Sequence, residues 1–182
     1  MTDNFKREVA HRIFAAEFKE SDLQVTEGEG TYAVPYLITP TGAKCNRVFI
    51  VGTLTEKEDV GTDSEFWRGR IVDPTGAFFV TAGQYQPEAA LFLANVEGPQ
   101  FVAVVGKPSI YETKEGIWLS SIKAESITVV DEATRDKWIQ ETAALTEKRL
   151  KIIPENVKEH YHTDVKAYQD MIAQAFESTK DI

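Results

Sequence analysis

The chain has 182 residues, of which 42% are hydrophobic, enough for one domain with a real core and an appendage. Its formal net charge of −9 excludes a protein that coats nucleic acid mainly through global positive charge. No apolar run approaches the roughly 20 residues of a membrane helix, and the first residues lack the apolar segment of a signal peptide. We therefore expect a cytoplasmic protein without membrane contact.

Apolar residues recur at helical spacing near the amino terminus, at Phe5, Val9, Ile13, Phe14 and Phe18. This spacing predicts an amphipathic helix that ends near residue 20. An acidic linker with glycines follows, so that residues 1–30 form a helix and a linker outside the main domain. The apolar stripe favours packing of the helix on its own domain over docking on a partner.

Several short extended segments follow, and glycines interrupt two of them. Residues 47–55 form the first long predicted strand, in which Gly52 marks a bulge or bend. Residues 101–106 form a continuous apolar strand that ends at Gly106. The acidic residues 56–65 predict a loop. Further strand segments are predicted at 110–111, 117–122 and 126–130, and a short helix at 87–94.

Residues 66–85 carry the clearest pattern in the chain and predict a β-hairpin. The sequence Asp-Pro-Thr-Gly at 73–76 suits the reversal, because proline presets φ, aspartate bonds nearby amides and glycine accepts positive φ. Alternation along the first strand puts Phe66, Arg68 and Arg70 on one face and the intervening residues toward the core. A ring and two cations on a solvated face suit a base and the phosphates of single-stranded nucleic acid.

These elements predict an all-β OB-fold domain over residues 31–131, a five-stranded Greek-key barrel. Glycines within strands let the strands curl around a small core, and the predicted helix falls between the third and fourth strands. A two-sheet sandwich is the alternative, but it would contain more strands and no helix at this point.

Residues 132–182 are predicted to form a helical extension of two helices. The first begins after Asp131 and ends before Pro154, and the second carries an apolar stripe that reaches Phe176. Both follow the last strand, so their apolar faces either fold back on the barrel or dock on another protein. For assembly with a partner, the expected contact residues are Trp138, Leu145, Ile152, Val165, Tyr168 and Ile172.

Sequence signatures of catalysis are missing from the chain. It has no nucleophile elbow, P-loop or dinucleotide fingerprint, so we expect neither an enzyme nor a cofactor. The three histidines lack partners at ligand spacing, and the single cysteine, Cys45, excludes an internal disulfide. We expect no catalytic residue and no metal, and we interpret Cys45 as structural.

Aromatic and basic residues are more informative. Tyr85, at the end of the third strand, and Tyr111, in the loop between the fourth and fifth, occupy positions where OB domains present rings for base stacking. One such ring alone is more often part of a core, but Lys107 and Lys123 add cations nearby. The predicted nucleic-acid interface consists of Phe66, Arg68, Arg70, Tyr85, Lys107, Tyr111 and Trp118.

Several segments resemble the archaeal replication-protein-A-associated proteins, at residues 7–10, 37–42, 47–55, 67–76, 82–89 and 105–108. The resemblance covers roughly residues 7 to 131. It implies a single OB domain similar to the middle subunit of replication protein A, working with a larger archaeal single-stranded-DNA-binding protein. In this resemblance Tyr85 and Tyr111 fall at the middle subunit's stacking aromatics, and the helix after Asp131 falls at its assembly helix.

The expected function is that of a single-stranded DNA-binding OB-fold subunit associated with archaeal replication protein A, in DNA replication, repair and recombination. We expect weak DNA binding by the chain alone and a hetero-oligomer with the larger subunit. The alternative is a scaffold or regulator of replication protein A that does not bind DNA, which the acidic composition favours. The chain departs from the middle subunit after Pro154, where a second helix stands in place of a flexible link to a winged-helix module.

Overall fold

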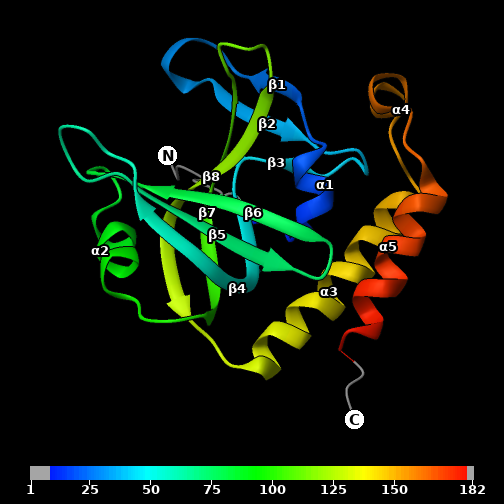
Figure 1. The fold of residues 1–182 in the computed structure, drawn as a ribbon. Coiled ribbons are helices and arrows are strands. Elements are labelled where there is room, and N and C mark those ends of the chain that lie inside the picture. Colours follow the sequence, from blue (N-terminus) through cyan, green and yellow to red (C-terminus); the bar gives the residue numbers. More distant parts are fainter. Residues whose placement is uncertain (1–8, 180–182) are drawn as a thin grey trace, which may run out of the picture.

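The computed structural model describes residues 9–179 of the chain. A closed β-barrel lies at the centre of Figure 1, with a small separate sheet above it. One helix lies on the left of the barrel and the carboxy-terminal helices lie on its right. Within the described residues, no helix is long and apolar enough to cross a membrane.

The barrel consists of β4 (Val48–Asp59), β5 (Trp67–Asp73), β6 (Gly76–Ala82), β7 (Gln100–Glu112) and β8 (Trp118–Val129). The strands close in the order β4-β5-β6-β8-β7, in which only β6 and β8 run parallel. Helix α2 (Pro87–Asn95) stands between the third and fourth strands of the barrel. The predicted five-stranded OB barrel is therefore confirmed.

The two predicted glycine bends lie where barrel strands approach closely. A β-carbon at Gly52 would come within 2.5 Å of the Val72 carbonyl oxygen, and one at Gly106 within 2.3 Å of the Lys123 carbonyl oxygen. Any larger residue would push two strands apart at these points.

Strand lengths differ from the predicted ones. The separate segments expected between residues 101 and 130 form only two long strands, because a bulge between Val105 and Gly106 bends the ribbon without ending the pairing. Strand β4 likewise continues through residues 56–59, which the acidic composition had predicted to be a loop. Cross-strand partners on β5 support this part of β4.

The predicted hairpin forms between β5 and β6, and Asp73 holds its turn. The Asp73 carboxylate accepts hydrogen bonds from the amides of Thr75 (2.7 Å) and Gly76 (3.1 Å), as the turn sequence predicts. It also accepts one from the Ala15 amide at 2.8 Å. Burial raises the pKa of Asp73, although these hydrogen bonds oppose the rise. The turn therefore fastens the amino-terminal segment to the barrel.

The amino-terminal helix is much shorter than predicted. Helix α1 covers Ala15–Lys19, whereas the described residues before it are not helical, and Phe5 lies outside the described residues. The backbone of His11 bonds to β4 through the Arg47 carbonyl and the Phe49 amide, each at 2.9 Å. These bonds replace helical ones, and the predicted apolar residues from 13 to 18 are buried without a long helix.

The stretch expected to be a linker belongs to the small sheet. Strands β1 (Leu23–Glu27), β2 (Val34–Ile38) and β3 (Lys44–Cys45) pair in that order, all antiparallel. The short 3-10 helix η1 (Gly30–Tyr32) connects the first two. The barrel therefore starts at β4. The expected domain boundary at residue 31 lies in η1, which connects β1 to β2 of the small sheet.

The first predicted carboxy-terminal helix is present as α3 (Glu132–Leu150), and Asp131 caps it by accepting a 2.8 Å bond from the Thr134 amide. The expected second helix is two helices, α4 (Glu155–Tyr161) and α5 (Val165–Glu177). His162 ends α4 in a left-handed conformation with a φ of 49°. No glycine or proline marks this break in the sequence, and the apolar stripe continues across it.

Helix α3 packs back on the barrel through Trp138, which is only 2% exposed. The Trp138 indole nitrogen donates to the Phe49 carbonyl oxygen at 2.9 Å, and its ring meets that of Phe14 edge-on at 5.7 Å. Three of the residues predicted to bind a partner are thus buried in this chain's own core, namely Trp138, Tyr168 and Ile172. The other three, Leu145, Ile152 and Val165, are exposed.

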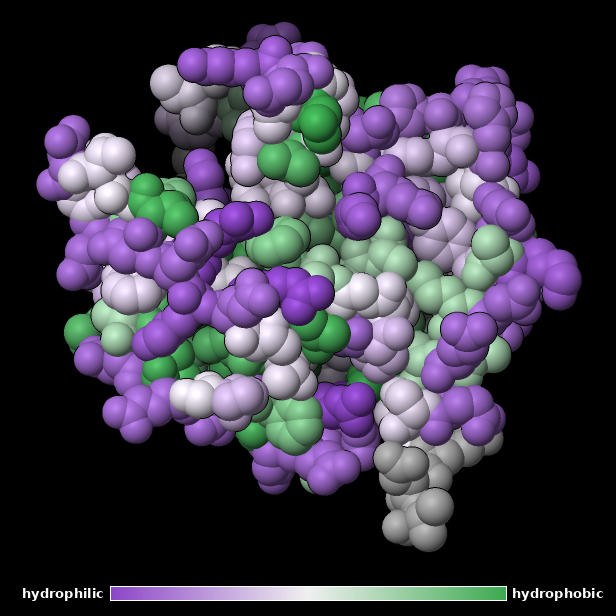
Figure 2. Space-filling model, in the orientation of Figure 1, coloured by the Kyte–Doolittle hydropathy of each residue, from purple (hydrophilic) through white to green (hydrophobic). Residues whose placement is uncertain are grey.

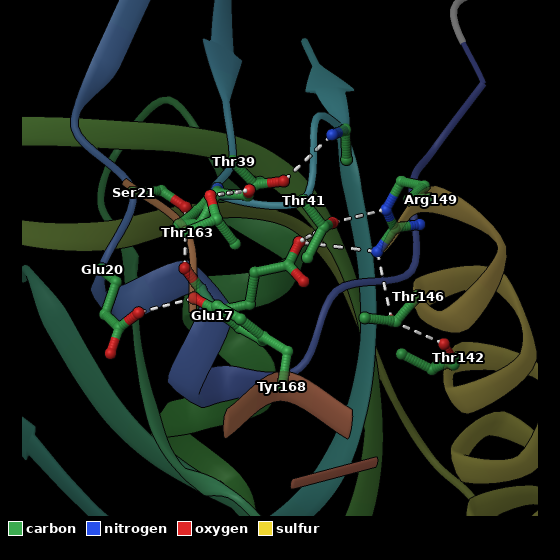
Figure 3. Close-up of polar contacts among 12 residues, drawn as sticks. Glu17, Glu20, Ser21, Thr39, Thr41, Thr142, Thr146, Arg149, Thr163 and Tyr168 are labelled. Atoms are coloured by element: carbon green, nitrogen blue, oxygen red, sulfur yellow. Dashed lines mark hydrogen bonds and ion pairs between the residues drawn. The ribbon is translucent and has the colours of Figure 1, made fainter. Parts of the chain in front are cut away.

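A buried polar network joins α1, the β2–β3 turn and α3 (Figure 3). Glu17 is fully buried, and its Oε2 accepts a 3.0 Å bond from the Thr41 hydroxyl and lies 3.5 Å from Nη2 of Arg149. Arg149 Nε also donates to the Thr41 hydroxyl oxygen at 2.8 Å. Desolvation raises the pKa of Glu17, although the Arg149 charge opposes it. Arg149 therefore compensates a buried charge far from it in sequence.

We predict that Arg149→Met lowers the free energy of unfolding by about 3–5 kcal/mol near pH 7, because Glu17 loses its counter-charge. The pKa of Glu17 in the folded state then rises further, so the loss shrinks as the pH falls and the carboxyl gains a proton. Urea unfolding near pH 7 and near pH 5 measures both effects.

The control is Lys166→Met, which removes only an exposed pair with Asp170. This variant should lose less than about 1 kcal/mol at either pH. An equal loss for Arg149→Met at both pH values would contradict the role of Glu17.

Candidate nucleic-acid interface

One row of outward-facing residues crosses four neighbouring strands of the barrel. The register places Arg68 of β5 opposite Thr81 of β6, Thr81 beside Lys123 of β8, and Lys123 opposite Lys107 of β7. Paired residues on adjacent strands point to the same face, and adjacent strands lie about 4.8 Å apart. Three cations therefore follow one line perpendicular to the strands. We call Arg68, Thr81, Lys123 and Lys107 the cationic row.

The lysine end of the row opens on a hollow of about 370 Å³ that also includes Tyr85. Tyr85 is 84% exposed and lies in the turn between β6 and α2, which the Gln86 amide closes by donating to the Gly83 carbonyl oxygen at 2.9 Å. Two ammonium groups and a solvated ring thus share one surface.

Tyr111 lies on the same face as the two lysines. Side chains alternate along β7, so Lys107 and Tyr111, four residues apart, point the same way, and Tyr111 stands opposite Leu119. Tyr111 is half exposed and belongs to the end of β7, not to the loop in which it was expected. Trp118 stands opposite Glu112 and therefore lies on the other face of the ribbon. The structure separates Trp118 from the other predicted rings.

The two hairpin arginines are engaged within the protein. The Arg68 guanidinium lies 4.2 Å from the centre of the Phe79 ring and 3.8 Å from the Glu58 carboxylate. Arg70 Nη1 donates to the Thr55 hydroxyl oxygen at 3.2 Å. The predicted arginines therefore lie on the outer face, as expected, but neither is without a partner.

Phe66 lies beside the turn that presents Tyr85. It precedes β5, is 42% exposed, and its ring would come within 2.9 Å of a β-carbon at Gly83. Asp59 orders the loop before it, because its carboxylate accepts bonds from the Gly61 and Phe66 amides, each at 3.0 Å. These bonds lower the pKa of Asp59.

Sequence reasoning missed the neighbours of the predicted residues. Alternation alone places Phe79 and Thr81 outward on the second hairpin strand, but only the register shows which cation each one adjoins. Glu56 and Glu58 were assigned to a loop, whereas they stand opposite Arg70 and Arg68.

The remaining titratable groups show no metal-binding arrangement within residues 9–179, where no three His, Cys, Asp or Glu side chains are grouped to hold an ion. Cys45 is buried, and its burial raises the pKa of the thiol to about 12. The thiol therefore stays protonated near neutral pH.

Neither a family model nor a curated protein matches the sequence. Among solved structures, a chain from a replication protein A heterotrimer bound to single-stranded DNA matches with a TM-score of 0.54 and 12% identity, over 78% of this chain and 98% of its own. The shared fold is the OB fold. At this identity the likeness concerns the fold alone.

Two bacterial single-stranded DNA-binding proteins match over about half of the chain. The second such protein of Mycobacterium smegmatis is 16% identical over 47% of this chain and 86% of its own, with a TM-score of 0.41. A small one from Mycoplasma pneumoniae is 17% identical over 46% of this chain and 92% of its own, with a TM-score of 0.37.

We predict that Lys107→Gln raises the free energy of unfolding by about 0.2–1 kcal/mol at low salt, because like charges directly opposite on paired strands repel. Urea unfolding at low and at high salt measures the change, which screening should diminish. Lys166→Gln is the control, since it removes a favourable pair with Asp170 and should not stabilise. A loss of stability in Lys107→Gln would contradict the repulsion.

Proposed function

We propose that this chain is a single-stranded DNA-binding subunit that works with a larger archaeal replication protein A subunit in DNA replication, repair and recombination. The observation that carries the proposal is the cationic row, which ends in a hollow containing the exposed Tyr85 ring. A chain of a replication protein A heterotrimer bound to single-stranded DNA shares the fold over 98% of its length, which supports the proposal at the level of the fold.

In this proposal the lysine end of the row binds the backbone and the rings bind bases. Lys107 and Lys123 each contact a phosphate, while Tyr85 and Tyr111 stack on bases from the same face. Each phosphate contact to a single strand contributes about −0.7 to the slope of log K against log salt. Two lysines therefore give a shallow slope, about −1.4, and weak binding by the acidic chain alone.

We predict that Tyr85→Ala and Tyr111→Ala each weaken the binding of oligo-dT, because each lost stack costs about 1–3 kcal/mol. The dissociation constant should rise about fivefold to 150-fold for each variant, measured by fluorescence anisotropy with a labelled oligonucleotide. Tyr32→Ala removes an 87% exposed ring on η1, outside both the barrel face and the helical groove, and should leave DNA binding unchanged. Wild-type affinity in the double tyrosine variant, alone and with the larger subunit, would refute the DNA-binding role.

The helical extension offers a surface for the larger subunit. Helices α3 and α5 form a groove of about 500 Å³, whose apolar lining consists of Ala143, Ala144, Ile172, Ala173 and Phe176. Glu147 and Glu177 stand among its polar lining residues. In Figure 2 pale green atoms lie over α3 and α5, on the right of the view, with purple ones around them.

The shape and charge of this groove suit one helix of the partner. The alanines in its lining allow a helix to approach closely, and its acidic lining residues favour Lys or Arg beside the partner's apolar stripe. We propose that the larger replication protein A subunit supplies this helix.

We predict that Ala144→Arg weakens binding of the larger subunit at least about tenfold, because it fills the groove and repels basic flanks. Isothermal titration calorimetry against the larger subunit encoded in the same genome measures the effect. Ala133→Arg, at an exposed position in the first turn of α3, is the matched control and should bind normally. Equal affinities of the two variants would place the partner elsewhere.

The acidic neighbours of Arg68 and Arg70 favour a second function, that of a scaffold or regulator of replication protein A without direct DNA binding. If the chain is a scaffold, it binds the larger subunit normally. Replacing Tyr85 and Tyr111 by alanine then leaves the DNA affinity unchanged, both for the chain alone and for the complex. The two variant sets above therefore distinguish the functions.

A further inference from the structure

Two glutamates occupy the arginine end of the candidate interface. Strand β4 continues far enough to place Glu58 opposite Arg68 and Glu56 opposite Arg70, and the Glu58 carboxylate lies 3.8 Å from the Arg68 guanidinium. Both glutamates are exposed on the outer face. The cationic row therefore begins with a carboxylate at its β4 end.

The Phe79 ring is also covered by the protein itself. The Arg68 guanidinium lies 4.2 Å from the ring centre, close enough for a cation–π contact. A base cannot stack on the face that this guanidinium occupies. The surrounding hollow, about 260 Å³ between β4, β5 and β6, is lined mainly by charged residues.

The lysine end of the cationic row differs from the arginine end in its ion pairs. Within residues 9–179, neither Lys107 nor Lys123 forms an ion pair. The nearby Glu125 carboxylate is held by Arg47 through two contacts, of 2.7 and 3.0 Å. Glu88 also lines the hollow at the lysines, so the two ends differ in ion pairing and not in the presence of carboxylates. Only at Arg68 does a phosphate meet a cation that a carboxylate already neutralises.

We propose that Glu56 and Glu58 limit the affinity of this chain for single-stranded DNA by competing with phosphates for Arg68 and Arg70. The inference rests on the proposed DNA-binding function. The glutamates confine the bound strand to the lysines and tyrosines and shorten its contact with the barrel. An exposed ion pair is weak, but the carboxylates also repel a phosphate that approaches the arginines, and both effects oppose contact there.

The test is the double variant Glu56→Gln with Glu58→Gln, which removes both charges and keeps side-chain size. Its dissociation constant for labelled oligo-dT should fall about threefold to thirtyfold at low salt. The slope of log K against log salt should steepen by up to about 1.4, because two further phosphates come into contact. Adding Arg68→Gln and Arg70→Gln should abolish the gain.

The matched control is Glu155→Gln with Glu159→Gln on α4, which changes the net charge equally on a helix that lies apart from the barrel (Figure 1). A similar gain in this control would show a general charge effect and overturn the inference. Unchanged or weaker binding by the Glu56 and Glu58 variant would also overturn it. The proposed function would still stand in that case if Tyr85→Ala weakens binding, whereas absence of binding by every variant would refute both.

Discussion

The short parallel pairing between β6 and β8 is the contact on which the candidate interface depends. Two residue pairs form it, Val80 with Ile122 and Thr81 with Lys123. Val80 and Ile122 are fully buried in the barrel core, so apolar burial on the inner face holds the strands together. On the outer face the same pairing carries the line of cations from the β5–β6 hairpin to the β7–β8 ribbon. Without barrel closure these cations would lie on separate surfaces.

The helical extension forms a surface that is separate from the cationic face of the barrel. Trp138 and the Glu17–Arg149 contact hold α3 against the barrel and the amino-terminal segment. Helix α5 packs on α3, and between them the two helices leave a groove whose lining includes three alanines. The two proposed roles, DNA binding and assembly, therefore involve separate groups of residues, which substitutions can distinguish.

The arrangement of charges on the barrel face differs from what the net charge of the chain suggests. The chain carries a net charge of −9, yet its register brings three cations into one line. The same register sets two glutamates opposite the hairpin arginines. Composition alone describes neither arrangement, because side chains on different strands become neighbours only through pairing. A surface of this mixed charge favours weak binding of an anionic ligand over tight binding.

Sequence alone determined the features that depend on near neighbours: the Asp73 turn, the apolar strands that contain Gly52 and Gly106, and the start of α3 after Asp131. From these followed the barrel, its inserted helix and the outward face of the hairpin. Tertiary structure alone decided the short α1, the β1–β3 sheet and the break at His162, because backbone pairing and packing from distant segments override local spacing. It also buried Trp138 and placed Glu58, Arg68 and Lys123 in one row, since their contacts join residues far apart in the chain.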